Sequence, residues 1–135
     1  MILGVDHVGV AVESLEAALR FWQGSLGLTP EHSEALAAQG VRTVLLPAAG
    51  VRIELLEPTG PETPVGKFLA RRGPGLHHVC LLVDDLDAAL RELAASGLRL
   101  IDPVARPGVE GSRIAFLHPE AGAGVLVELK EMVRR

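Results

Sequence analysis

Residues 6–20 read DHVGVAVESLEAALR, and residues 77–91 read HHVCLLVDDLDAALR. The second stretch lies 71 residues after the first and repeats its second-position histidine, its alternating apolar residues and its Ala-Ala-Leu-Arg ending. Further on, residues 50–57 (GVRIELLE) match residues 124–131 (GVLVELKE) at an offset of 74. Each half of the chain therefore opens with a histidine and closes with a glutamate. Two copies are too few for a solenoid, which needs about three repeats, so the pattern indicates two fused copies of one module.

The first copy begins with the pattern of a strand followed by a helix. Apolar residues alternate over Val8–Val12, which predicts a strand with one buried face and one open face. Ser14 is the expected N-cap of an amphipathic helix, and Gly27 is its expected C-terminal glycine. A second strand is only weakly marked near Leu28. Residues 30–39 have no clear period, and we interpret them as a loop or a frayed helix that borders a strand.

The first copy then ends in a predicted hairpin. Val41–Leu46 and Val51–Leu56 have strand character, and Pro47–Gly50 supplies the turn between them. Three prolines in residues 58–64 predict a linker, and a short helix is expected over Val65–Arg72.

The second copy repeats the strand and the helix, with Asp84 or Asp85 as N-cap and Gly97 at the end. Three later segments are expected to be strands: Leu98–Ile101, Arg113–Leu117 and Val125–Leu129. The tally is β-α-β-β-β per copy, and the predicted class is α+β. We place repeat one at about residues 4–58, the linker at 59–74 and repeat two at about 75–131, all in a single domain of 1–135.

The amino-acid composition excludes several classes of function. A chain of 135 residues with 48% hydrophobic residues is long enough for a real core, which must be aliphatic because aromatic residues make up only 3%. That scarcity, with a net charge of −4, argues against a nucleic-acid partner. The single cysteine excludes an internal disulfide, and neither a signal-peptide pattern nor a membrane-span pattern is found. We expect a cytoplasmic protein with a small-molecule partner.

Four residues combine matched positions with matched chemistry: His7, His78, Glu54 and Glu128. The histidines open the first strand of each copy, and the glutamates lie inside the last strand. The alternate residues of these strands are needed for packing on the helices, so the His/Glu faces are expected to line the other side of the sheet. If a pseudo-twofold axis relates the two copies, all four residues converge in one cleft.

Carboxylates among apolar neighbours are costly to bury unless a positive charge lies beside them. Two imidazoles and two carboxylates suit a first-row divalent metal such as Co, Mn, Ni, Zn or Fe, with two positions left for substrate. The alternative is structural: a duplicated fold could keep these residues only as relics of its packing symmetry.

The motifs resemble the vicinal oxygen chelate (glyoxalase-like) superfamily, and within it the epimerases that act on methylmalonyl-CoA. The resemblance covers nearly the whole chain. It rests on Asp6-His7-Val8, Gly75-Leu76-His77-His78-Val79, Phe116-Leu117-His118-Pro119 and Gly124-Val125-Leu126-Val127-Glu128-Leu129. It implies a curved, cup-shaped mixed sheet around a metal site.

The resemblance further implies that His7, Glu54, His78 and Glu128 are the metal ligands, with Glu54 and Glu128 catalytic. The implied cofactor is a divalent ion, Co, Mn, Ni, Zn or Mg. Where some members carry a further glutamate, proposed as a catalytic base, this chain has Thr43, so the two proton-transfer groups stay unassigned.

The function implied is interconversion of (R)- and (S)-methylmalonyl-CoA through a metal-stabilised enolate. The alternatives are a glyoxalase I-like lyase, an extradiol dioxygenase, and a non-catalytic binding protein of the drug-sequestering type. The partner would be an acyl-CoA, with no nucleic acid and no membrane, and family analogy implies a homodimer.

Eight further residues are weaker candidates for the site. Cys80 is expected to be an apolar filler, His77 to point away from His78, and His118 to be structural in its turn. The basic cluster of Lys67, Arg71 and Arg72 is either a contact for the phosphates of coenzyme A or a solvated face. Ser112 and Arg113 are candidates for contact with a substrate carboxylate.

Overall fold

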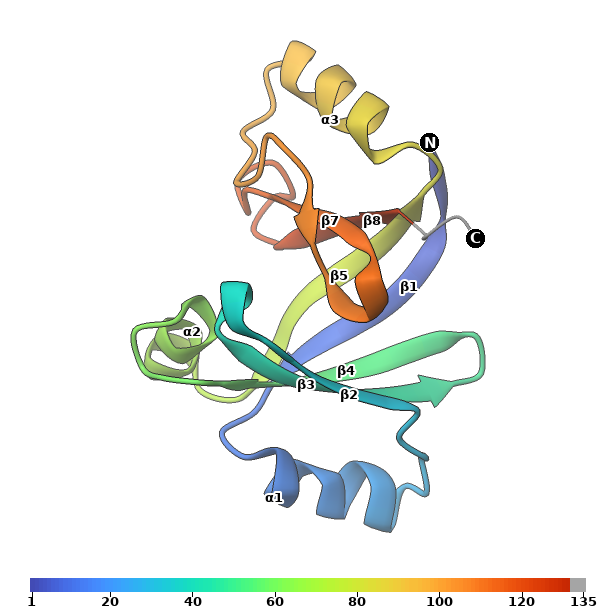
Figure 1. The fold of residues 1–135 in the computed structure, drawn as a ribbon. Helices are drawn as coiled ribbons and strands as arrows, with labels where there is room; N and C mark the ends of the chain where they lie inside the picture. The colour runs from blue at the N-terminus through green and yellow to red at the C-terminus, as the bar shows by residue number, and fades with distance from the viewer. Residues whose placement is uncertain (132–135) are drawn as a thin grey trace. The chain divides into compact units, whose positions relative to one another are not determined.

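A computed structural model describes residues 1–131. These residues form two compact units. The N-terminal unit contains His7–His77, and the C-terminal unit contains Met1–Asp6 together with the chain from His78 onward. Strands β1 (Ile2–Ala11) and β5 (Gly75–Val83) each contribute residues to both units (Figure 1).

In the N-terminal unit the strand order is β2-β3-β4-β1. The strands are β2 (His32–Leu36), β3 (Val41–Ala48) and β4 (Val51–Pro58), with the second half of β1. Strands β2, β3 and β4 are antiparallel neighbours, whereas β4 runs parallel to β1. The parallel pair requires a crossover, which the helix after β1 begins.

Helix α1 (Leu15–Leu19) continues as a π-helical segment, Arg20–Ser25. As predicted, Ser14 is the N-cap, since its hydroxyl oxygen accepts a hydrogen bond from Ala17 N at 3.2 Å. Gly27 follows the helical segment with φ of +77°. In Figure 1 this helix runs along the strands of its own unit, and it packs on one face of them. The buried residues of that face are Val10, Val12, Val44, Leu46 and Leu55.

The hairpin between β3 and β4 is tighter than predicted. Ala48 pairs with Val51, so only Ala49 and Gly50 form the loop. Their φ angles are +54° and +97°, as in the two-residue turns whose twist matches that of paired strands. Pro47, expected in the turn, is instead part of β3.

The interpretation of residues 30–39 as a loop or frayed helix was wrong for His32–Leu36, which form a strand. The second strand of the module is β2, rather than a strand near Leu28, and a 3₁₀ turn (Ala37–Gln39) follows it. Strand β2 is an edge strand whose five residues all pair with β3. Pairing with a well-buried neighbour explains a strand that its own sequence, HSEAL, does not favour.

The short helix expected after the linker is confirmed as α2 (Pro64–Arg72), with Thr63 as its N-cap. Phe68 and Leu69 point inward as predicted and pack against a buried cluster of the same unit. That cluster consists of Ala11, Val41, Leu56 and Val65. Helix α2 therefore covers one end of the sheet face that α1 leaves free.

The C-terminal unit has the order β1-β5-β8-β7-β6, with β6 (Arg106–Pro107), β7 (Arg113–Leu117) and β8 (Val127–Glu131). A 3₁₀ turn, Val109–Gly111, lies between β6 and β7. Asp84 N donates to Met1 O, so the start of β1 lies beside the end of β5. Strand β8 runs parallel to β5 and antiparallel to β7.

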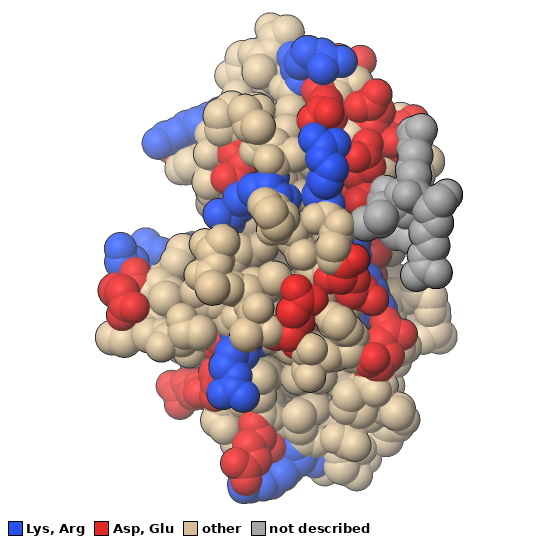
Figure 2. Space-filling model, in the orientation of Figure 1, with Lys and Arg blue, Asp and Glu red and all other residues tan. Residues whose placement is uncertain are grey.

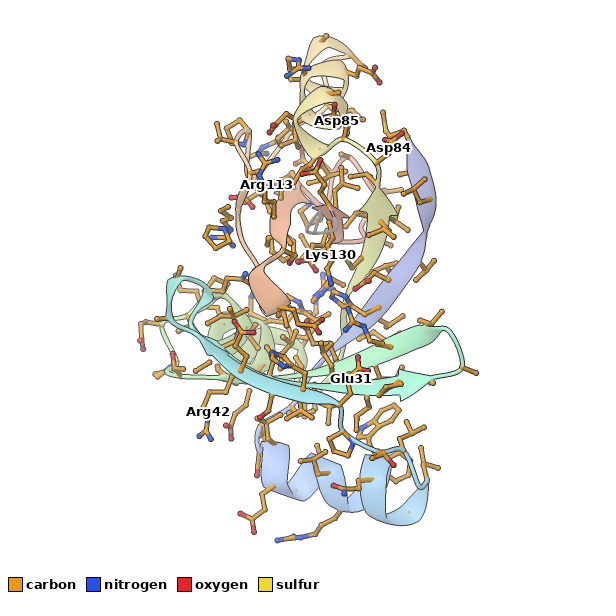
Figure 3. All side chains as sticks on the ribbon, turned by 45° about the vertical axis from the view of Figure 1, so that its right-hand side comes forward. Glu31, Arg42, Asp84, Asp85, Arg113 and Lys130 are labelled. Carbon is orange, nitrogen blue, oxygen red and sulfur yellow. The ribbon has the colours of Figure 1, made fainter. Side chains whose placement is uncertain are left out.

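Helix α3 (Leu86–Ala95) packs on this second set of strands. Asp85, labelled at its start in Figure 3, is the N-cap and accepts from Ala88 N at 3.0 Å, which resolves the choice between Asp84 and Asp85. Leu86 and Leu90 are buried against Val83 and Leu129. Among residues 1–131 no helix combines the length and apolar character needed to cross a bilayer.

Two predicted strands of the second copy need correction. Leu98–Ile101 is not a strand, because only Leu100 forms a bridge, to Leu117. The second strand of this copy is instead β6, which pairs with β7. The last strand begins at Val127 rather than Val125, since Gly122–Val125 closes a turn before it.

The expected open face of the first strand was also wrong. His7 and Ala11 are 3% and 0% exposed, so the face that carries the histidine is as buried as the valine face. The face of this strand that carries His7 is therefore an interior surface.

Candidate functional site

The first histidine–glutamate pair lies on adjacent parallel strands of the N-terminal unit. In the register of β1 and β4, Glu54 faces Gly9, and His7 lies two residues before Gly9 on the same face. His7 and Glu54 are therefore diagonal neighbours on adjacent strands, and His7 Nε2 lies 3.4 Å from Glu54 Oε1. Both residues are 3% exposed. The sequence predicted the pair, and the parallel register is what brings its members together.

The second pair repeats this geometry in the C-terminal unit. Glu128 on β8 faces Cys80 on β5, and His78 lies two residues before Cys80. His78 Nε2 is 3.1 Å from Glu128 Oε1, and the residues are 4% and 6% exposed. The duplication therefore extends from sequence to side-chain geometry.

The donor atoms fit a divalent metal. Two ligand atoms bound side by side to one ion, each at about 2.1 Å, lie about 3 Å apart. The separations of 3.4 and 3.1 Å within the two pairs agree with that value. A hydrogen bond between imidazole and carboxylate has a similar length, but buried carboxylates gain more from a full positive charge.

The ring of Phe116 packs against the ring of His78. The two ring centroids are 5.7 Å apart in an edge-to-face arrangement, and Phe116 faces Glu128 in the register of β7 and β8. His77 points away from His78, as predicted, and contacts Phe68 with centroids 4.9 Å apart. An edge-to-face contact of this kind favours this orientation of the His78 ring.

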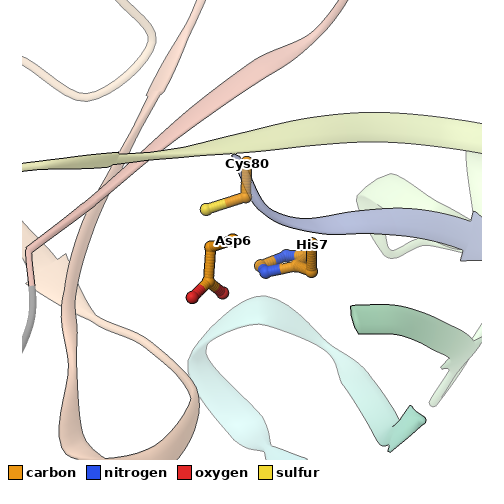
Figure 4. A group of neighbouring side chains, drawn as sticks. All are labelled: Asp6, His7 and Cys80. Atoms are coloured by element: carbon orange, nitrogen blue, oxygen red, sulfur yellow. The ribbon is translucent and has the colours of Figure 1, made fainter. Parts of the chain in front are cut away.

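The sequence reasoning missed an ion pair in the unit that contains the second histidine–glutamate pair. Lys130 Nζ lies 3.2 Å from Asp6 Oδ2, with side chains 5% and 11% exposed. Asp6 also lies next to the fully buried Cys80 (Figure 4). The alternation Glu128-Leu129-Lys130 places Lys130 on the same face as Glu128, and that period-two pattern could have revealed it.

A second missed pair lies on β2. His32 Nε2 is 2.8 Å from Glu34 Oε1, and both side chains are about one-third exposed. It was missed because residues 30–39 were interpreted as a loop or frayed helix, in which facing side chains cannot be assigned.

Other candidates have structural contacts. The ring nitrogen Nδ1 of His118 accepts from Glu120 N at 3.1 Å, which supports the structural role predicted for His118. Ser112 is buried and donates to Val109 O at 2.7 Å. Arg113 donates to Asp87 Oδ1 at 2.7 Å and to Glu131 Oε2 at 2.9 Å. The hydrogen bond from Arg113 holds the pKa of Asp87 below its usual value.

The predicted basic cluster lies on α2, where Lys67, Arg71 and Arg72 are exposed. The Arg72 guanidinium lies over the ring of Phe68, 5.7 Å from its centroid. On the face of the molecule drawn in Figure 2, basic and acidic side chains are mixed.

Comparison with known proteins gives consistent results. The family model described as Glyoxalase/Bleomycin resistance protein/Dioxygenase superfamily matches residues 6–116. The mitochondrial methylmalonyl-CoA epimerase of Dictyostelium discoideum is 36% identical over 128 residues, which cover 94% of this chain and 77% of that protein.

Solved structures agree closely as well. The crystal structure of methylmalonyl-CoA epimerase from Mycobacterium tuberculosis has a TM-score of 0.93 at 40% identity, covering 98% of this chain and 90% of that one. A methylmalonyl-CoA epimerase in complex with methylmalonyl-CoA and NH4+ has a TM-score of 0.93 at 35% identity, covering 98% and 96%. The predicted fold class, α+β with paired βαβββ modules, is thereby confirmed.

Proposed function

The chain belongs to the glyoxalase/bleomycin resistance protein/dioxygenase superfamily and, within it, to the methylmalonyl-CoA epimerases, and on that premise we propose that it interconverts (R)- and (S)-methylmalonyl-CoA. The observation that carries the proposal is the pair of buried histidine–glutamate contacts, repeated at matching strand positions. A complete set of two imidazoles and two carboxylates favours an enzyme over a drug-sequestering protein.

His7, Glu54, His78 and Glu128 would together hold one divalent ion. The support is their matched chemistry, their burial and the separation of the atoms within each pair. The bound ion would supply positive charge where negative charge develops on the thioester and carboxylate oxygens of the substrate.

The chain itself supplies orientation and a dry environment. Phe116 holds the His78 ring, and buried strand residues surround both glutamates, which keeps water away and strengthens every charge interaction at the site. A base must remove the α-proton from one side of the carbon, and an acid must return a proton from the other side.

The test follows the α-hydrogen in deuterated buffer. Incubation with methylmalonyl-CoA should introduce one solvent deuterium at the α-carbon without changing the carbon skeleton. Exchange should stop on chelation and return when a divalent metal is restored. A protein-free sample measures the spontaneous rate.

The same preparation distinguishes the alternatives. Turnover of methylglyoxal that depends on glutathione would indicate the lyase, and oxygen uptake with a catechol would indicate the dioxygenase. Either result in the absence of exchange would overturn the epimerase proposal. The homodimer and the cytoplasmic location stay predictions.

A further inference from the structure

Strand β2 carries a histidine–carboxylate pair that the proposed metal site does not use. His32 and Glu34 are two residues apart on one strand, so their side chains project from the same face. His32 Nε2 lies 2.8 Å from Glu34 Oε1. The side chains are 33% and 29% exposed, so the pair is partly enclosed but open to a small molecule.

The sheet register places this pair on the same face as the first metal pair. Residues directly opposite each other on neighbouring strands share a face. One row across the sheet consists of His32, Leu45, Glu54 and Gly9, and the next row consists of Glu34, Thr43, Leu56 and Ala11. His7 lies two residues before Gly9 and so on this face too. Helix α1 packs on the opposite face.

The separation suits a substrate head group. Two strand spacings, about 10 Å, separate the backbones at His32 and Glu54, with β3 between them. Leu45 and the short side chain of Thr43 form the floor, both about 1% exposed. A head group held at Glu54 that extends over β3 would bring its α-carbon toward β2, where Glu34 carries a carboxylate.

The ion pair between His32 and Glu34 contributes little to the stability of the protein. Partly exposed ion pairs typically stabilise a protein by about 0–1 kcal/mol. The two residues also interrupt an edge strand whose other inward residue, Leu36, packs against the apolar cluster under α2. At the border of this apolar patch the Glu34 carboxylate is within hydrogen-bond distance of the His32 ring, the arrangement of a proton-transfer group that is oriented by a second side chain.

We propose that Glu34 is a catalytic residue, the proton-transfer group on the β2 side of the substrate, and that His32 is a positioning residue that orients its carboxylate. The assignment rests on the proposed epimerase function. In one direction the α-carbon–hydrogen bond breaks, its electron pair stays on the substrate as the enolate, and the proton moves to a Glu34 carboxylate oxygen. A second group then adds a proton to the opposite side. In the reverse direction Glu34 returns the proton, so no oxidant or reductant is needed.

The experiment uses Glu34→Gln, which keeps the shape of the side chain but replaces the basic carboxylate by an amide that cannot take up the proton. Pure (R)- and (S)-methylmalonyl-CoA are incubated separately with the metal-loaded protein in deuterated buffer. Epimerisation should fall by about 10²- to 10⁴-fold, the usual contribution of a general acid or base. Exchange of the α-hydrogen should be lost for one epimer only, because the second group still deprotonates the other.

His32→Gln should weaken exchange of that same epimer by a smaller factor. Ser33→Ala, on the outer face of the same strand, and Glu16→Gln, an exposed carboxylate on α1, should exchange both epimers as the wild type does. Metal content and circular dichroism should be unchanged in all four variants.

Three outcomes would contradict the assignment. If Glu34→Gln exchanges the α-hydrogen of both epimers at nearly the wild-type rate, Glu34 transfers no proton. If Glu34→Gln loses exchange of both epimers equally while its fold and metal content are intact, Glu34 does not act on one side of the substrate only. Absence of exchange in the wild-type protein overturns the epimerase proposal and this assignment with it, and the wild-type control separates that case from the other two.

Discussion

Leu86 N donates a hydrogen bond to Glu131 Oε1 at 3.2 Å, which ties the last residue of β8 to the first turn of α3. Leu15 N and Glu57 Oε1 form the equivalent contact at 3.4 Å in the N-terminal unit. In each module a carboxylate from the last strand thus satisfies a free amide at the helix start, where negative charge is favoured. The repeat is preserved in hydrogen bonding as well as in sequence.

Replacing Glu131 by Ala should lower the free energy of unfolding by about 1 kcal/mol, as the loss of a helix cap typically does. Glu57→Ala should have a similar effect on the N-terminal unit. Chemical denaturation measures both, with Glu92→Ala, an exposed position on α3, as the control. Equal stability of all three variants would show that the contacts do not cap the helices.

His7→Ala and His78→Ala should each weaken binding of a divalent metal by at least about tenfold, because each removes one of four ligands. Elemental analysis and competition with a chelator measure the loss. His118→Ala is the matched control, since that imidazole accepts a bond within its own turn. Wild-type affinity in both site variants would reject the ligand set.

Glu54→Ala and Glu128→Ala should lose activity while they keep the fold, because Leu55 and Leu129 beside them carry the packing. Turnover and circular dichroism separate the two effects. Unfolding of both variants, even with metal added, would instead favour a purely structural role for the glutamates.

Arg113→Gln should raise the pKa of Asp87 toward that of an ordinary aspartate, because it removes the guanidinium hydrogen bond that lowers it. A group with a lowered folded pKa adds stability above its unfolded pKa, and that stability disappears as the pH falls through the folded pKa. Wild type and variant should therefore differ at neutral pH and converge in acid. Titration of the Asp87 carboxyl by NMR checks the direction, and an unchanged pKa would contradict it.

Leu55→Ala should lower the free energy of unfolding by about 2–5 kcal/mol, as expected when a buried leucine leaves a cavity. Leu55 is 0% exposed in the cluster under α1. Leu76→Ala, at a position 73% exposed, is the matched control and should change stability little. Similar losses in both variants would contradict the assignment of this core.

The sequence by itself determined the duplicated module, the helices with the cap at Ser14, and the two histidine–glutamate pairs, whereas it left the second cap open between Asp84 and Asp85. These features could be predicted because each depends on a local sequence pattern. Apolar residues alternate along strands and recur at helical spacing on the buried faces of helices, and a capping residue precedes each helix. The repeat added the long-range information, since matched positions in two copies have matched places in the fold.

Only the tertiary structure decided the edge strand β2, the pairs His32–Glu34 and Asp6–Lys130, and the burial of the His7 face. The sequence of β2 does not favour a strand, and it becomes one because β3 offers it a buried, fully formed partner. Contacts between residues 124 positions apart, as in Asp6 and Lys130, depend on strand order, which local pattern does not encode. The diagonal from His7 to Glu54 likewise exists because β1 and β4 pair in one parallel register, and a slip of one residue would turn Glu54 to the opposite face.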